Sequence, residues 1–303
     1  MRWPADHPAV TDPALAPWAG EVDRLCPEAD VIRVLRHLPG RRVTTLVDTP
    51  DGVAVLKLFA TSRARGGHRR LSALAESTAA PFVPRPLGHR KGHLLLVEFV
   101  PGTPMDRLDD DALVAAAGPA GRALRRLHDS GVELDRTWDV GEETAQLRRT
   151  AGPESRALVE RAIARWAPRA DLGPSLPAHR DCHPAQIVWV GDGVRFIDLD
   201  DSAMAPPALD VENFVAHLDM DSVLGRRPDH VVAAAVEAFA EGYGSDPPGL
   251  TPWRRLALAR LAALAETRHR RPEDARALWA AVERFGRGPG EAATRVANAE
   301  RRA

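Results

Sequence analysis

The first hundred residues alternate apolar and polar positions in short runs, the period-2 pattern of half-buried β-strands. Three such runs cover residues 31–38, 42–48 and 53–59. The segment between the second and third runs reads Thr-Pro-Asp-Gly, in which proline presets φ and glycine tolerates positive φ. We therefore expect a tight hairpin here and an antiparallel sheet around it.

A helix and one more hairpin complete the pattern of this first part. Over residues 63–78 the apolar positions recur at helical spacing, and the proline-rich segment 81–86 ends that helix. A turn at residues 90–92 then leads into residues 93–100, an almost wholly apolar run that is typical of a buried strand. The pattern predicts a small α+β lobe over residues 1–100.

Beyond Pro104 the apolar positions follow the helical period of 3.6 residues instead. The runs that predict helices are residues 108–130, 154–169, 229–242, 251–267 and 272–285. One stretch interrupts them, because residues 187–190 and 194–197 are strand-like and are joined by Gly-Asp-Gly. We expect a mainly helical lobe over residues 101–303, and a lone hairpin among helices indicates a functional site.

Composition narrows the class of protein. The chain has 303 residues and 44% apolar content, enough for a sizeable core, and its 41 basic and 42 acidic side chains nearly cancel to a formal charge of -1. Such a balance does not favour a nucleic-acid or anionic-membrane partner. Two cysteines form no disulfide framework, and neither a signal-peptide core nor an apolar run of about 20 residues is present. We expect a cytoplasmic protein without a membrane span; oligomeric state is not predicted.

The densest chemical segment flanks the lone hairpin. Asp181 lies on the loop before it, within His179-Arg180-Asp181, and Asp198 lies at the end of the returning strand. Phosphoryl transfer needs a carboxylate to orient the hydroxyl nucleophile, oxygen ligands for Mg²⁺ and cations on the phosphates. Strand pairing would bring Asp198 towards Asp181, and Gln186 can add an amide oxygen of the kind that Mg²⁺ prefers. The segment therefore offers the first two of these three requirements.

These residues resemble the catalytic segment of the aminoglycoside phosphotransferase and choline kinase superfamily, whose bilobal fold is similar to that of protein kinases. The family pattern is His-x-Asp-x-x-x-x-Asn followed by Ile-Asp, and it stands here as His179, Asp181, Gln186 and Ile197-Asp198. Glutamine replaces the usual asparagine and adds one methylene. The resemblance implies that Asp181 is the catalytic carboxylate, that Gln186 and Asp198 hold Mg²⁺, and that His179 is structural support.

The resemblance extends to both sides of this segment. It implies that Asp210, which precedes a helix, locks the catalytic loop to the larger lobe, and that Lys57 holds the phosphates of ATP. It also implies a hinge at residues 98–100, where the backbone of Glu98, Phe99 and Val100 would bind the adenine edge. The phosphate-covering loop would correspond to residues 38–44, so Arg42 and Thr44 become candidate nucleotide contacts.

Some positions keep other interpretations open. Protein kinases pair the strand lysine with a helical glutamate, and the only Glu between Lys57 and residue 97 is Glu76, near the end of the predicted helix. Lys57 could instead be an edge-strand lysine that discourages aggregation. Together with Gln186, the doubtful Glu76 leaves room for a degenerate kinase fold that binds nucleotide without transfer.

A metal-dependent hydrolase is the alternative from another enzyme class. The same segment contains possible zinc ligands, namely His179, Asp181, Cys182, His183 and Asp198. The two histidines would share a face only on a helix, whereas Pro184 and the following strand place them on a loop. Spacing therefore favours the kinase.

For the acceptor, the resemblance implies a hydroxylated small molecule, such as an aminoglycoside or related antibiotic, a sugar or an amino alcohol. A cationic acceptor would need carboxylates around it. The candidates by position are Glu142, Glu143, Asp200, Asp201, Asp219 and Asp221.

Overall fold

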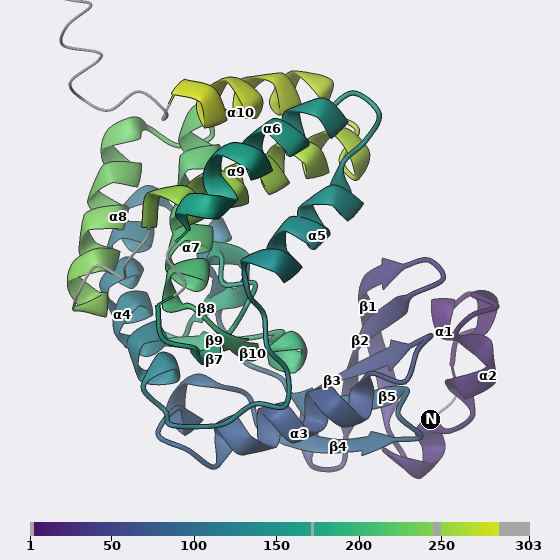
Figure 1. Cartoon of the computed structure of the whole chain (residues 1–303). Coiled ribbons are helices and arrows are strands. Elements are labelled where there is room, and N and C mark those ends of the chain that lie inside the picture. Colours follow the sequence, from purple (N-terminus) through teal and green to yellow (C-terminus); the bar gives the residue numbers. More distant parts are fainter. Residues whose placement is uncertain (1–2, 171–172, 245–249, 285–303) are drawn as a thin grey trace, which may run out of the picture.

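A five-stranded antiparallel sheet forms one end of the molecule (Figure 1). The computed structural model describes residues 3–170, 173–244 and 250–284. The strands follow the order β1-β2-β3-β5-β4, with bounds β1 (Asp30–Leu38), β2 (Arg42–Thr49), β3 (Gly52–Phe59), β4 (Pro86–Arg90) and β5 (Leu94–Glu98). The β2–β3 pairing runs in register from Arg42 opposite Phe59 to Thr49 opposite Gly52, so the predicted hairpin is present.

The two faces of this sheet are covered by different segments. On one face, the short helices α1 (Pro8–Thr11), α2 (Ala16–Ala19) and η1 (Val22–Arg24) pack against Leu56 and Leu58. On the other face, α3 (Ala64–Ala75) packs beside Phe59. Because side chains alternate along a strand, Lys57 points to the face that carries α3.

Seven helices longer than ten residues make up most of the rest of the described chain. They are α4 (Asp110–His128), α5 (Val140–Thr150), α6 (Arg156–Trp166), α7 (Pro207–Val223), α8 (Asp229–Tyr243), α9 (Leu250–Thr267) and α10 (Pro272–Arg284). The apolar pattern predicts neither α5 nor α7: the buried face of α5 consists of Glu143, Thr144 and Leu147 and lacks an apolar stripe, and α7 is buried on most sides, so it has no single apolar face. The remaining runs correspond to helices with ends shifted by a few residues.

The predicted hairpin within the helical part is confirmed. Strands β8 (Ile187–Trp189) and β9 (Val194–Phe196) pair antiparallel, and β6 (Thr103–Pro104) joins them in the order β6-β8-β9. A second small sheet pairs β7 (Leu176–Ala178) with β10 (Ala203–Ala205). Short 3-10 turns lie between these strands, among them η3 (Met105–Arg107), η5 (Pro184–Gln186) and η6 (Leu199–Asp201).

The architecture is the bilobal α+β arrangement expected of a protein-kinase-like fold. One hydrophobic cluster joins the two lobes, since Phe59, Leu71 and Leu95 of the small lobe lie in the same buried cluster as Leu124 of α4 and Phe239 of α8. A second cluster lies among α5, α6, α7, α9 and α10. We propose that the boundary between the two lobes lies near residue 100. In the part of the chain that the structure describes, no helix is both long and apolar enough to cross a membrane.

Candidate active site

Lys57 lies in the central strand of the five-stranded sheet and is 6% exposed. Its Nζ atom donates hydrogen bonds to Asp198, at 2.5 Å, and to Asp200. Burial alone would lower the pKa of Lys57, but the two carboxylates outweigh it and raise that pKa, so the ammonium stays charged. The edge-strand interpretation of Lys57 is wrong, because β2 and β5 flank β3 on both sides.

Arg42 and Thr44 lie on β2 beside Lys57. Thr44 is the direct cross-strand partner of Lys57, and Arg42, two residues earlier, shares its face of the sheet. Arg42 donates to Asp198 at 3.3 Å and lies 3.7 Å from Asp200. Although burial lowers the pKa of Arg42, the two aspartates raise it above the ordinary value. Two cations of the small lobe therefore converge on two carboxylates of the large lobe.

Asp198 follows β9 with φ of 63°, a left-handed conformation that is uncommon for residues other than glycine but that aspartate adopts more readily than most. Gln186 donates its Nε2 atom to Asp198 at 3.4 Å. Burial would raise the pKa of Asp198, yet Lys57 and Arg42 hold it well below the usual range. Its carboxylate is a hard oxygen donor that suits Mg²⁺, which takes few protein ligands and completes its shell with phosphates and water. The amide of Gln186 turns its nitrogen towards Asp198 and would have to turn over to offer its oxygen to the same ion.

Asp181 lies on the loop before β8, and its side chain is 42% exposed. Arg260 of α9 donates to one of its oxygens at 3.4 Å, and His183 lies 3.8 Å from the other. Partial burial raises the pKa of Asp181, but His183, Arg260 and Arg180 outweigh it and hold the pKa well below the ordinary value. The carboxylate of Asp181 is thus ionised and accessible to solvent, two properties that a group accepting a hydroxyl proton needs.

The loop that carries Asp181 is anchored by Asp210, which lies in the first turn of α7 rather than before the helix as expected. The fully buried Asp210 carboxylate accepts hydrogen bonds from the backbone N–H groups of His179, at 2.6 Å, and Arg180, at 2.7 Å. His128 of α4 donates its Nε2 proton to the same carboxylate at 3.2 Å. His179 in turn donates from Nε2 to the carbonyl of Ile197 at 2.9 Å, which ties the loop to the residue before Asp198.

The predicted hinge follows β5. This strand ends at Glu98, so the backbone of Phe99 and Val100 lies beyond the ladder of the sheet. The Glu98 side chain does not point to open space: both of its oxygens accept from Arg195 of β9, at 3.1 and 2.8 Å. A bidentate, charge-assisted pair therefore links the end of β5 to the β8–β9 hairpin.

The zinc interpretation finds little support in this geometry. His179 is engaged with Ile197, the ring of His183 stacks on that of His217 with centroids 4.3 Å apart, and Cys182 is fully buried. In residues 3–170, 173–244 and 250–284, no three His, Cys, Asp or Glu side chains are arranged to hold a metal ion.

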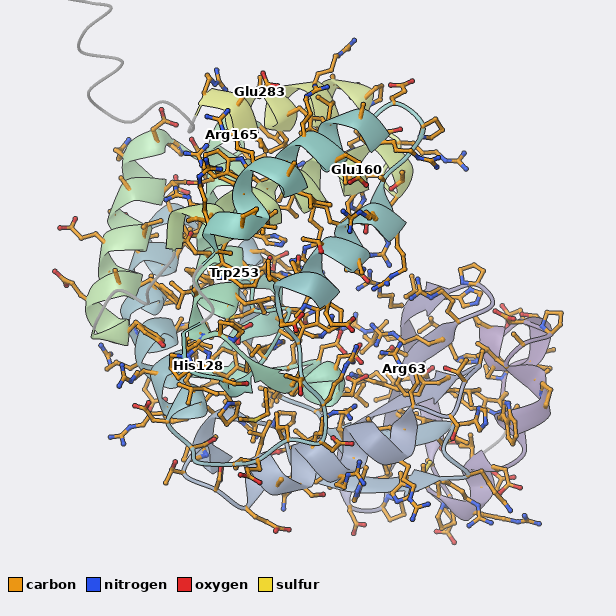
Figure 2. The ribbon with its side chains drawn as sticks, in the orientation of Figure 1. Arg63, His128, Glu160, Arg165, Trp253 and Glu283 are labelled. Carbon is orange, nitrogen blue, oxygen red and sulfur yellow. The ribbon has the colours of Figure 1, made fainter. Side chains whose placement is uncertain are left out.

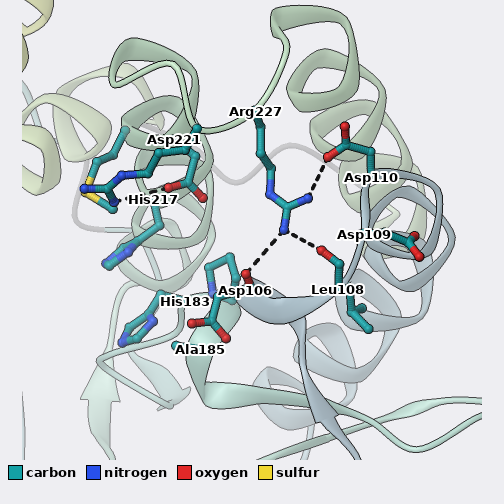
Figure 3. A pocket seen from close by; sticks show the side chains of 12 residues that line it. Asp106, Leu108, Asp109, Asp110, His183, Ala185, His217, Asp221 and Arg227 are labelled. Carbon is teal, nitrogen blue, oxygen red and sulfur yellow. Dashed lines mark hydrogen bonds and ion pairs between the residues drawn. The ribbon is translucent and has the colours of Figure 1, made fainter.

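A cavity of about 640 Å³ lies beside the catalytic loop (Figure 3). His183 and Ala185 of the loop line one side, and Asp106, Asp221 and Arg227 line the others. Arg227 donates to the carboxylate of Asp110 and to the carbonyl of Leu108, so its charge is satisfied. This cavity adjoins the His183 side of Asp181 and has room for a small acceptor.

Most of the candidate acids for a cationic acceptor are already paired. Asp200 binds Lys57, Asp219 binds Arg254, Asp221 lies 3.5 Å from Arg226, and Glu143 accepts from Trp138 and lies 3.5 Å from Arg260. Asp201 pairs with Arg136, Arg180 and Arg63, the last at the start of α3 (Figure 2). Among the six, only Glu142 has no ion pair within the described residues.

A model of the phosphotransferase enzyme family matches residues 35–258, which is most of the chain. The chain belongs to this phosphotransferase family. No curated protein matches it in a sequence search. The family assignment accounts for the bilobal fold and for the catalytic segment together.

Solved structures agree on the fold of this phosphotransferase. Aminoglycoside phosphotransferase APH(3'')-Id from Streptomyces rimosus is 22% identical, with a TM-score of 0.59 over 80% of this chain and 95% of that one. Choline kinase from Cryptosporidium parvum is 10% identical, with a TM-score of 0.60 over 88% and 94% of the two chains. At these identities the likeness shows the fold alone.

Several residues of this phosphotransferase site give no signal in the sequence. Arg260 lies in an Ala- and Leu-rich helix with several arginines, so nothing distinguishes it before folding brings it to Asp181. Arg195 is an ordinary strand residue until it meets Glu98. Glu76, the doubtful candidate for a partner of Lys57, is exposed at the C-terminal end of α3 and does not bind it. Asp198 and Asp200 do.

Proposed function

We propose that this phosphotransferase is an ATP-dependent kinase that moves the γ-phosphate to a hydroxyl of a small molecule. The acceptor class is an aminoglycoside or related antibiotic, a sugar or an amino alcohol. One observation carries the proposal: Lys57 and Arg42 of the sheet converge on Asp198, whose hairpin follows directly on the loop that exposes Asp181. Cations for phosphates, oxygens for a metal and an ionised carboxylate are the parts that phosphoryl transfer needs.

In this proposal, Lys57 and Arg42 turn from Asp198 to the phosphates of the bound nucleotide, and the backbone of residues 98–100 binds the adenine edge. Asp198 and Gln186 hold Mg²⁺, which neutralises phosphate charge when bound. A solved structure of APH(3'')-Id with ADP and streptomycin, with a TM-score of 0.54, supports a nucleotide and a hydroxylated antibiotic as ligands of this fold.

Asp181 acts on the acceptor. Its carboxylate accepts a hydrogen bond from the hydroxyl and so aims the hydroxyl oxygen at the γ-phosphorus for in-line attack. As the new O–P bond forms and the bond to ADP breaks, the hydroxyl proton passes to Asp181 and then to water. Because Arg260 and His183 keep the Asp181 pKa low, Asp181 is a weak base that orients the hydroxyl first and takes its proton late.

The test is a coupled ADP-release assay with MgATP against a panel of aminoglycosides, other hydroxylated antibiotics, sugars and amino alcohols. We expect Asp181→Asn to lower turnover by at least about 100-fold while stabilisation by MgATP in thermal melts is kept. Asp192→Asn, in the exposed turn between β8 and β9, is the matched control and should retain full activity.

Near-normal turnover of Asp181→Asn would refute the mechanism. Stabilisation by MgATP without ADP release from any acceptor would favour the nucleotide-binding, catalytically degenerate alternative. The hydrolase would be favoured if MgATP neither stabilised the protein nor gave ADP release, and if a hydrolytic activity that is lost on chelation were restored by Zn²⁺ alone.

A further inference from the structure

The helix beside Lys57 lacks the acid that protein kinases use there. Active protein kinases hold their strand lysine with a glutamate on the next helix. Here α3 reads Ala-Arg-Gly-Gly-His-Arg-Arg-Leu-Ser-Ala-Leu-Ala and contains no carboxylate. Glu76 caps its C-terminal end and is exposed. A different residue must fix the Lys57 ammonium while it binds phosphate.

Asp200 occupies that place. It lies in η6, two residues after Asp198, and accepts a hydrogen bond from the Nζ atom of Lys57. Its side chain is 7% exposed, whereas that of Asp198 is 23% exposed. The more exposed Asp198 also lies next to Gln186, so Asp198 is the carboxylate that a metal reaches, and Asp200 stays behind it with Lys57.

The sequence of α3 is adapted to Asp200. A Cβ atom on Gly67 would lie 2.9 Å from the Cβ of Asp200 and 3.3 Å from its carbonyl oxygen, so only glycine permits this approach. Arg70, one turn later, donates to the carbonyl oxygen of Asp200 at 2.6 Å. Glycine weakens a helix interior, so its presence in α3 fits a requirement for close packing. At Gly67, α3 therefore has no side chain, and this leaves room for Asp200 of η6, which supplies the carboxylate.

We propose that Asp200 is the positioning residue for Lys57 and takes the role that a helical glutamate has in protein kinases. This inference rests on the proposed kinase function. It predicts that Lys57 leaves Asp198 but keeps Asp200 when nucleotide and metal bind. Asp200 then acts through Lys57 on the transferring phosphate and touches neither the metal nor the acceptor.

The first test is a crystal structure of the wild-type protein with Mg²⁺ and AMP-PNP. We expect the Lys57 ammonium between Asp200 and the phosphates, and Asp198 on the metal. Asp200 on the metal, or Lys57 separated from Asp200, would overturn the inference while leaving the kinase function intact. Failure of the protein to bind AMP-PNP would overturn both.

The second test is kinetic. In the ADP-release assay, Asp200→Asn should lower kcat by about 10- to 100-fold, the effect of losing one charge-assisted hydrogen bond in the transition state, with a smaller change in KM for MgATP. Glu76→Gln is the control and should leave both values unchanged. An Asp200→Asn protein with wild-type kcat would contradict the inference.

A transplant separates positioning from mere packing. Asp200→Gly removes the carboxylate and the Cβ atom that would lie 2.9 Å from a Cβ at position 67, leaving backbone contacts of 3.3 and 3.4 Å there. Gly67→Glu in that background returns a carboxylate from α3. We expect the double variant to regain at least about tenfold in kcat over Asp200→Gly, because the lysine is again held by an acid. A double variant that melts like Asp200→Gly and gains no activity would show that the position of the carboxylate is not what Lys57 needs.

Discussion

The buried carboxylate of Asp210 gives a quantitative prediction about stability. It accepts three hydrogen bonds, from the backbone of His179 and Arg180 and from the ring of His128, at 2.6, 2.7 and 3.2 Å. In Asp210→Ala all three donors lose their acceptor, two of them in fully or partly buried backbone. An unsatisfied buried donor costs about 1–3 kcal/mol, so with three donors the variant should lose about 3–9 kcal/mol of unfolding free energy.

Such a loss is a large part of the roughly 5–15 kcal/mol by which a folded protein is stable. Urea denaturation followed by far-UV circular dichroism measures it, with Asp192→Ala in the exposed β8–β9 turn as the control. Asp210→Asn keeps one acceptor oxygen and should fall between the wild type and the alanine variant. A loss below about 1 kcal/mol for Asp210→Ala, at an unchanged m-value, would refute the idea that Asp210 anchors the loop.

The remaining predictions concern pH, thiols and metal. Because the pKa of Asp181 is held low, its ionised form persists as pH falls through the ordinary carboxylate range, and kcat/KM should not decline there. Arg260→Met removes a positive charge beside Asp181, so the acid limb of the kcat/KM profile should move to higher pH. Burial raises the pKa of Cys26 to about 11 and that of Cys182 well above its usual value. A thiol reagent at pH 8 should therefore label neither cysteine until the protein is denatured. Rapid labelling of the native protein would contradict this. Chelation should abolish ADP release, and Mg²⁺ rather than Zn²⁺ should restore it.

The sequence predicts those parts of the fold that neighbouring residues determine, such as tight turns and the strands beside them. The Pro-Asp-Gly turn and the alternation around it specify the β2–β3 hairpin, and Gly191-Asp192-Gly193 specifies the catalytic one. The pattern does not predict α5 because two of its three buried positions, Glu143 and Thr144, are polar; Glu143 accepts from Trp138, just before the helix, and lies 3.5 Å from Arg260 of α9. The spacing of apolar residues does not reveal a helix whose buried face is largely polar and hydrogen-bonded.

The candidate site divides in the same way. Asp181, Gln186 and Asp198 lie within 18 residues, so their spacing in one loop and hairpin is enough to single them out. The pairing of Lys57 with Asp200 joins positions more than 140 residues apart, and only the folded chain shows that the acid comes from η6 rather than from α3. Sequence therefore predicts residues that act through a contiguous motif, and it misses partners that depend on how two lobes meet.

The hydrophobic cluster shared by the two lobes has a consequence for how the chain is made. Phe59, Leu71 and Leu95 are buried partly by α4 and α8, so a polypeptide of residues 1–100 would present this apolar surface to water. On the ribosome, the segment that emerges first must therefore wait for later helices before its core is closed, and in that interval it is the species most prone to aggregate. The lobe that we propose to bind nucleotide therefore becomes a unit of structure only when the rest of the chain has been synthesised.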